Sequence, residues 1–238
     1  MSDPGDLLLS VRGEARQTVS PDSATVAAAI EVSRASKTEA LRAAAADLDS
    51  LTADLAAQGG VALDAGTGRR PLTWSARSAT THEERVPDGR TGRYEPTGRV
   101  TALVEVMMTV RAFDLLDALG DVLATHETVS VHQVMWHVDW DNPAWPGTRA
   151  AAIQAAIRKG RDYAAALGGS LRSVQHIADA GLLGGDNAQP RFIGGVAARA
   201  FSRGGEESGT PSLDPVPQEL TATVEARLTA DGVTLPVP

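Results

Sequence analysis

The chain has no cysteine, which excludes disulfide bonds, catalysis by a thiol and thiolate metal ligands. Aromatic residues make up only 4% of the sequence, so alanine, valine and leucine must fill most of the core. No block of lysine or arginine stands out, and the formal net charge of -8 disfavours nucleic acid and anionic membranes as partners. No window approaches the roughly 20 apolar residues of a membrane span.

A recognisable secretion signal is also missing. The N-terminal stretch MSDPGDLLLSVRGEA has no basic start and only a short run of leucines. A signal peptide needs an apolar region of roughly 7–15 residues. We therefore expect a cytoplasmic location. The 238 residues, 42% of them hydrophobic, suffice for one large domain or for two small lobes in close contact.

Hydrophobic periodicity predicts strands and helices in irregular alternation. The best helix begins at a capping box, Ser36 to Glu39, and continues as a leucine and alanine stripe until Gly59-Gly60. Further helices are predicted at 113–124 and 148–167. Strands are predicted at 7–19, 24–32, 72–81, 99–110, 128–138, 171–180 and 220–228, with a polar hairpin loop at 82–98. This order predicts an α+β fold of antiparallel sheets with helices packed on one face.

The connection at 181–218 is rich in glycine, proline, serine and aspartate. Connections of this length without regular structure are uncommon, and they are usually mobile or functional. We expect residues 184–215 to be mobile.

Two sequence blocks resemble the SIMPL domain family, a bacterial family of unknown function. The first block is VRGEARQTVSPDSATVAAAIEV followed by SKTEAL. The residues that match the family pattern are Gly13, Glu14, Pro21, Asp22, Ala24, Val26, Glu39 and Ala40.

The second block is AAIQAAIRKGRDYAAALGGSL, which has a small residue at every fourth position and ends in the family's Leu-Gly pair, Leu167-Gly168. A ladder of small side chains lets a helix lie close to a sheet. Gly160, inside this helix, costs about 1 kcal/mol relative to alanine, so we expect a close contact there. The ladder consists of Ala152, Ala156, Gly160, Ala164 and Gly168.

The resemblance implies a single SIMPL-like domain at 5–232, made of two interleaved α+β lobes. We expect one lobe at 5–95 with 171–232 and the other at 96–170. The resemblance also implies a homo-oligomer. It implies no established catalytic residues and no cofactor, although most relatives are exported, envelope-associated proteins.

The stretch HVDWD places His137, Asp139 and Asp141 at alternate positions, which lie on one face of an extended strand. These side chains form a candidate metal site, but alternate strand residues are roughly 6–7 Å apart, too wide for one ion. We therefore expect no bound metal and interpret the stretch as a strand end followed by a turn. His126 and His132 are further candidates, but His132 and His137 are expected to face opposite sides of the strand.

Two aromatic residues of this region, Trp136 and Trp140, share the predicted face of His132, where core or interface packing is the simplest interpretation.

The first functional hypothesis is a non-enzymatic module that self-associates and binds a protein or small ligand. The alternative is a metal-dependent hydrolase that uses His137, Asp139 and Asp141. A third possibility is a ligand pocket between the lobes with one of the two tryptophans in its wall.

Overall fold

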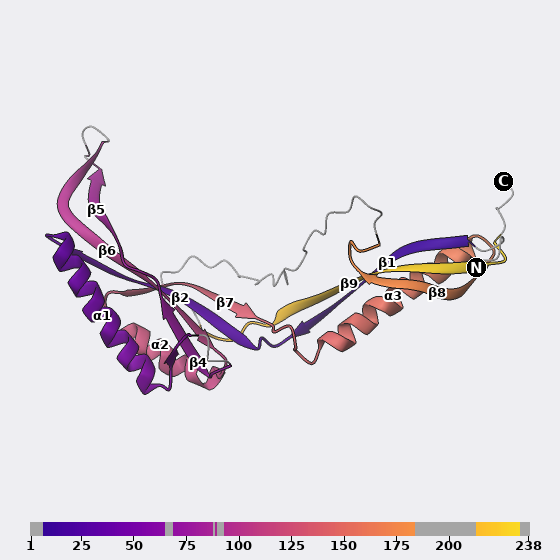
Figure 1. Cartoon of the computed structure of the whole chain (residues 1–238), viewed down its shortest axis with the longest axis horizontal. Helices are drawn as coiled ribbons and strands as arrows, with labels where there is room; N and C mark the ends of the chain where they lie inside the picture. The colour runs from indigo at the N-terminus through magenta and orange to yellow at the C-terminus, as the bar shows by residue number, and fades with distance from the viewer. Residues whose placement is uncertain (1–6, 65–68, 88, 90–92, 184–212, 234–238) are drawn as a thin grey trace. The chain divides into compact units, whose positions relative to one another are not determined.

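The structure is a computed structural model that describes residues 7–64, 69–87, 89, 93–183 and 213–233. These residues form three α-helices and nine β-strands, and the strands are arranged in two sheets (Figure 1). The predicted α+β class is confirmed. Contacts divide the chain into two units. Unit 1 comprises Met1–Ser20, Val138–Arg199 and Pro217–Pro238, and unit 2 comprises Pro21–His137 and Ala200–Val216.

These bounds differ from the expected lobes of 5–95 with 171–232 and of 96–170. Strand pairing explains the difference. β2 (Ser23–Arg34) pairs with both β6 (Tyr94–Val110) and β7 (Val129–His137), which joins most of 21–137 in one sheet. β1 (Leu7–Val19) pairs instead with β9 (Gln218–Asp231), and α3 (Trp145–Ala166) packs on both strands. Each unit is still built from separated segments of the chain.

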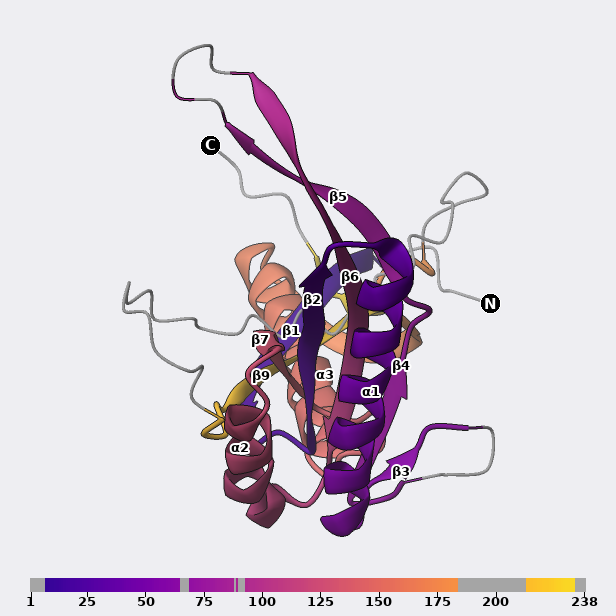
Figure 2. The same cartoon turned by 90° about the vertical axis from the view of Figure 1, so that its left-hand side faces the viewer.

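Unit 2 is a sheet with helices on one face (Figure 2). The strand order is β3-β4-β6-β2-β7, with β5 beside β6. Strand pairs are antiparallel except for β3 and β4. β2 buries alternate residues of its predicted apolar face, each at most 3% exposed, against α1 (Lys37–Ala57) and α2 (Leu116–Thr125). The remaining elements are β3 (Val61–Ala62), β4 (Leu72–Ala76), β5 (Thr80–Pro87) and the short 3-10 helix η1 (Phe113–Leu115).

Helix α1 begins where the capping box predicts. The Ser36 hydroxyl oxygen accepts a hydrogen bond from the Glu39 amide at 3.3 Å. Ala40, Ala44, Leu51 and Leu55 are fully buried, which places the predicted stripe on the sheet. After the helix, Gly59 has a φ of 79°, a left-handed conformation that glycine adopts without strain. The predicted helix and both of its ends are confirmed.

The region at 72–98 differs from the prediction. The single strand expected at 72–81 is two strands, β4 and β5, and most of the expected loop at 82–98 belongs to the β5–β6 hairpin. Its side chains are mostly exposed, so hydrophobic alternation is weak there although the backbone pairs. From Arg85–Pro96 to Pro87–Tyr94, β5 pairs with a part of β6 that β2 does not reach. Main-chain hydrogen bonding, which polarity does not reveal, extends this hairpin.

Unit 1 is a three-stranded antiparallel sheet, β1-β9-β8, with α3 on one face; β8 is Ser170–Asp179. α3 begins at Trp145, slightly before the predicted 148, because Pro146 is compatible with a first helical turn. The small-residue ladder faces the sheet, and Ala152, Ala156, Gly160 and Ala164 are buried. A Cβ added at Gly160 would overlap Leu228 Cδ1. The predicted close contact between helix and sheet is confirmed.

Of the long connection at 181–218, residues 184–212 lie outside the described part of the chain. Leu213 and Val216 pack against the core of unit 2. Among the described residues, no helix is long and apolar enough to cross a membrane. The cytoplasmic location stays a prediction.

Candidate functional site

The HVDWD stretch is the end of a strand, as the sequence predicts. His137 is the last residue of β7, and its half-buried ring Nε2 lies 2.9 Å from Thr25 Oγ1. Asp139 and Asp141 follow in a turn, in which the Asn142 amide donates to the Asp139 carbonyl at 3.1 Å. The Trp145 indole N–H donates to the same carbonyl at 2.9 Å. The hydrogen bonds of this stretch therefore close the turn before α3.

Across the described residues, no group of three or more histidine, aspartate and glutamate side chains is placed to hold a metal ion. His137, Asp139 and Asp141 do not form such a group. His126 lies apart from them, with its Nε2 2.9 Å from Asp54 Oδ2. The expectation that the protein needs no metal or cofactor stays a prediction.

The predicted faces of β7 need a correction. Its pairing with β2 contains a register shift at Ala27/Ala28, so Val131 and Val134, three residues apart, both pack on the core. Because of this irregularity, the alternation of side chains along a regular strand does not predict which face His132 shares with the residues after it. Trp136 is buried and meets Phe113 edge to face at a centroid distance of 5.6 Å, whereas Trp140 lies outside the strand and is 84% exposed. The prediction that the two tryptophans share a face was wrong.

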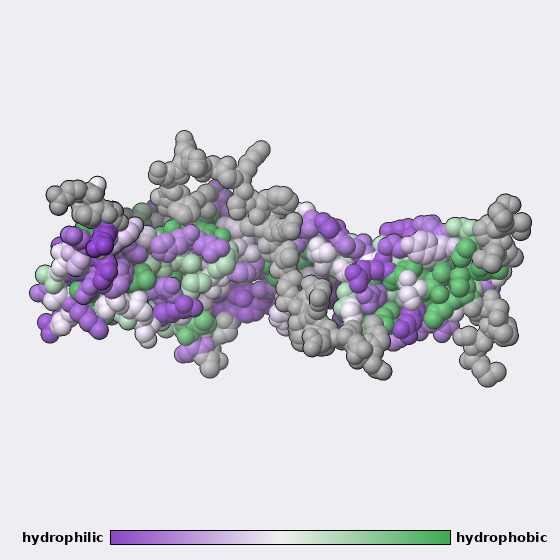
Figure 3. Space-filling model, turned by 90° about the horizontal axis from the view of Figure 1, so that it is seen from above, coloured by the Kyte–Doolittle hydropathy of each residue, from purple (hydrophilic) through white to green (hydrophobic). Residues whose placement is uncertain are grey.

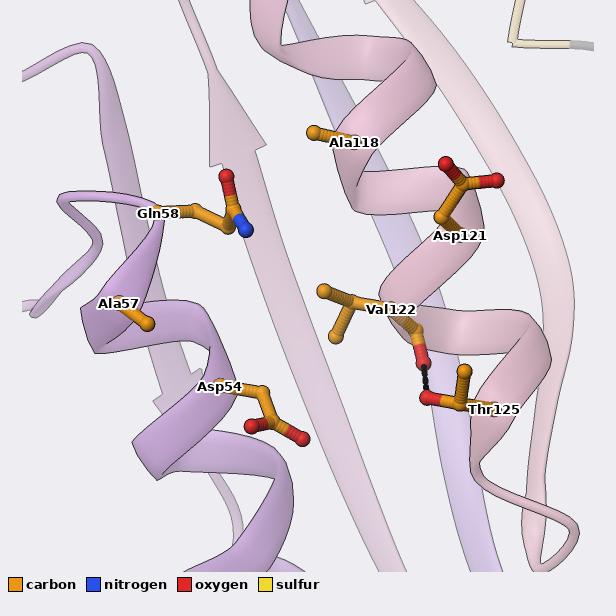
Figure 4. Close-up of a pocket in the computed structure, with 7 residues that line it drawn as sticks. All are labelled: Asp54, Ala57, Gln58, Ala118, Asp121, Val122 and Thr125. Carbon is orange, nitrogen blue, oxygen red and sulfur yellow. Dashed lines mark hydrogen bonds between the residues drawn. The ribbon is translucent and has the colours of Figure 1, made fainter.

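A groove of about 330 Å³ lies between the last turns of α1 and helix α2 (Figure 4). Ala57, Ala118 and Val122 supply apolar walls, and carboxylates stand on both sides, Asp54 from α1 and Asp121 from α2. The remaining lining residues are Gln58 and Thr125. The two helices that form this groove lie far apart in the sequence and meet only in the folded protein. No local sequence pattern therefore predicts the groove.

The electrostatics of the α1–α2 groove favour positive charge. Neither helix has a basic residue in its last turn. The last turn of α1 and the last turn of α2 line opposite ends of this groove, and the C-terminal end of a helix carries a partial negative charge. With two carboxylates added, the groove suits an ammonium or guanidinium group.

In unit 1, the face of the sheet opposite α3 is charged. Arg12 Nη2 and Glu225 Oε1 are 2.8 Å apart, and Arg16 lies 2.7 Å from Glu14 and 3.5 Å from Glu219. The hydrogen bond from Arg12 holds the pKa of Glu225 below its ordinary value, although partial burial opposes this shift. This face is suited to water and to charged partners.

Taken together, two sheets with helices on one face define an α+β protein, and two carboxylates line the groove between α1 and α2. The sequence profile of the SIMPL family, described as a protein of unknown function (DUF541), matches residues 9–228. The chain therefore belongs to the SIMPL family, which confirms the resemblance found in the sequence. Among curated proteins, no match is found.

Proposed function

We propose that this SIMPL protein is a non-enzymatic binding module whose α1–α2 groove accepts a positively charged group of a protein or small ligand. The observation that carries the proposal is the pair of carboxylates, Asp54 and Asp121, on opposite sides of an apolar groove at two negative helix ends. The groove volume of about 330 Å³ is large enough for a lysine or arginine side chain.

The polar groups of the groove favour binding over chemistry. The Thr125 hydroxyl donates to the Val122 carbonyl of its own helix at 2.7 Å, so its proton is already engaged (Figure 4). The Asp54 carboxylate is hydrogen-bonded to the His126 ring, with 2.9 Å between Oδ2 and Nε2. These contacts fix the shape and charge of the groove without aligning a nucleophile with a base.

A titration with N-acetyl-arginine amide tests the groove, followed by NMR shifts of amides in α1 and α2. We expect saturable shifts centred on Asp54 and Asp121. Asp121→Asn should weaken binding roughly two- to fivefold, which is the usual contribution of one exposed ion pair. Asp49→Asn, which removes an exposed carboxylate of α1 outside the groove, is the matched control. Equal effects of the two variants, or no saturable shift, would count against the groove.

We further propose that the protein self-associates. The support is the long strands at the edges of its sheets, which leave main-chain donors and acceptors for another strand. Exposed apolar side chains add to it, since Leu8, Tyr163, Val174 and Ile177 of unit 1 are each at least 43% exposed. Hydrophobic residues are visible on this unit in Figure 3. Sedimentation equilibrium of the purified chain measures self-association directly, and a monomer at all concentrations would refute it.

The hydrolase alternative, with His137, Asp139 and Asp141, has no observation from the described residues in its favour. Metal analysis of the purified protein tests it independently.

A further inference from the structure

Strand β1 is the most regular long edge in the described part of the chain. It pairs with β9 from Leu7–Ala230 to Val19–Gln218 without a register shift. The other long strands at a sheet edge, β5, β7 and β8, all pair with at least one shift. Bulges and shifts of this kind protect an edge against pairing with another chain. β1 lacks this protection.

Among the strands that the structure describes, β1 pairs with β9 alone, so main-chain groups on its other side are directed outward. The Arg12 carbonyl accepts a hydrogen bond from Lys159 Nζ at 2.8 Å, which fits a carbonyl that faces away from β9. In an antiparallel ladder, alternate residues direct both their N–H and their C=O to the same side. Ser10, Glu14 and Arg16 therefore share the outward direction of Arg12.

We propose that β1 pairs antiparallel with β1 of a second copy, about a two-fold axis at Gly13. This pairing rests on the self-association proposed above and assigns it a surface. It is the register that pairs the whole strand, Leu7 opposite the second copy's Val19 and the reverse. This pairing also joins the three-stranded sheet of unit 1 in one copy to the same sheet in the second copy, which gives one continuous six-stranded sheet.

The charges on β1 select this register. With the axis at Gly13, Arg12 lies opposite the second copy's Glu14, and the symmetry repeats the pair. An axis at Arg12 places two arginines opposite each other, and an axis at Glu14 places two glutamates opposite each other. Like charges in direct opposition destabilise a strand pair. An axis at Ala15 pairs Glu14 with Arg16, but it shortens the paired stretch to residues 11–19.

Charge reversal on the full-length chain tests the proposal by sedimentation equilibrium. Arg12→Glu places two glutamates opposite each other, and Glu14→Arg places two arginines opposite each other. Each variant alone should dimerise about tenfold more weakly, because two favourable pairs become two repulsive pairs. An equimolar mixture of the two should recover the dimer, since all four facing charges are then opposite. Arg161→Glu, the same charge change at an exposed position of α3, is the control and should leave the dimer unchanged.

Lys159→Ala should strengthen the dimer, because it frees the Arg12 carbonyl for the second strand. A dimer that is unaffected by the β1 charge reversals would overturn this inference while leaving self-association in place. A chain that stays monomeric would overturn both.

Spin labels give a readout that does not depend on the charge variants. The chain has no native cysteine, so Ser10→Cys or Thr18→Cys carries one label per copy. At about 3.4 Å per residue, an axis at Gly13 separates the two labels by roughly 20 Å at position 10 and roughly 34 Å at position 18. An axis at Ala15 reverses this order. Distances that fit neither pattern would refute pairing through β1.

Discussion

Gly13 is the position at which a single methyl group most directly tests the packing of unit 1. A Cβ built there lies 2.5 Å from the Ala156 nitrogen and 2.8 Å from the Ala156 Cβ, and it overlaps the Ala152 carbonyl oxygen. Two of these three atoms belong to the backbone of α3, so no side-chain rotation can make room. Gly13→Ala must therefore push the whole helix away from β1.

Overpacking of a core typically costs about 1–3 kcal/mol, and the rigid neighbours place this site at the upper end. Replacing a glycine inside a strand returns about 0.5–1 kcal/mol, because alanine has less conformational freedom to lose. We expect Gly13→Ala to lower the free energy of unfolding by about 2 kcal/mol. For a chain of this size, the melting temperature should fall by roughly 4–8 °C.

Urea unfolding followed by circular dichroism measures this loss. Gly147→Ala is the control, because it makes the same substitution in the first turn of α3 with no atom within 4 Å of the new Cβ. It should be neutral or stabilising by at most about 1 kcal/mol. If Gly13→Ala unfolds at the same urea concentration as the unmodified chain, or higher, the helix does not rest on β1 at this position.

Two further predictions concern the same unit. Gly160→Leu should destabilise the fold by about 1–3 kcal/mol in urea unfolding. Gly160→Ala should destabilise it by less, because the added methyl group meets the flexible end of the Leu228 side chain. A Leu variant as stable as the unmodified chain would place this helix face in solvent. Because Arg12 holds the pKa of Glu225 down, the folded state gains stability above the ordinary glutamate pKa of about 4.3 and loses it as the pH falls through the lower folded value. Glu225→Gln should therefore be less stable than the unmodified chain at pH 7, and this difference should shrink toward pH 3; a difference independent of pH would contradict the ion pair.

Much of this architecture is local in origin, and the sequence by itself determined it. The capping box at Ser36 and the leucine stripe after it specify α1, because both act within a few helical turns. The alternation along β2 specifies a half-buried strand for the same reason. The ladder through Gly160 indicated a close contact between helix and sheet, since glycine inside a helix is unfavourable unless a neighbour needs the space.

The tertiary structure decided what depends on partners distant in the chain. Main-chain pairing, which is nearly independent of side-chain polarity, made strands of the polar residues around Arg85 and Glu95. A register shift against β2 ended the simple alternation in β7, so His132 could not be assigned a face by counting. Asp54 and Asp121 meet at one groove only because α1 and α2 pack on the same face of a sheet. No local pattern encodes such a meeting, since it depends on the order of the strands beneath the helices.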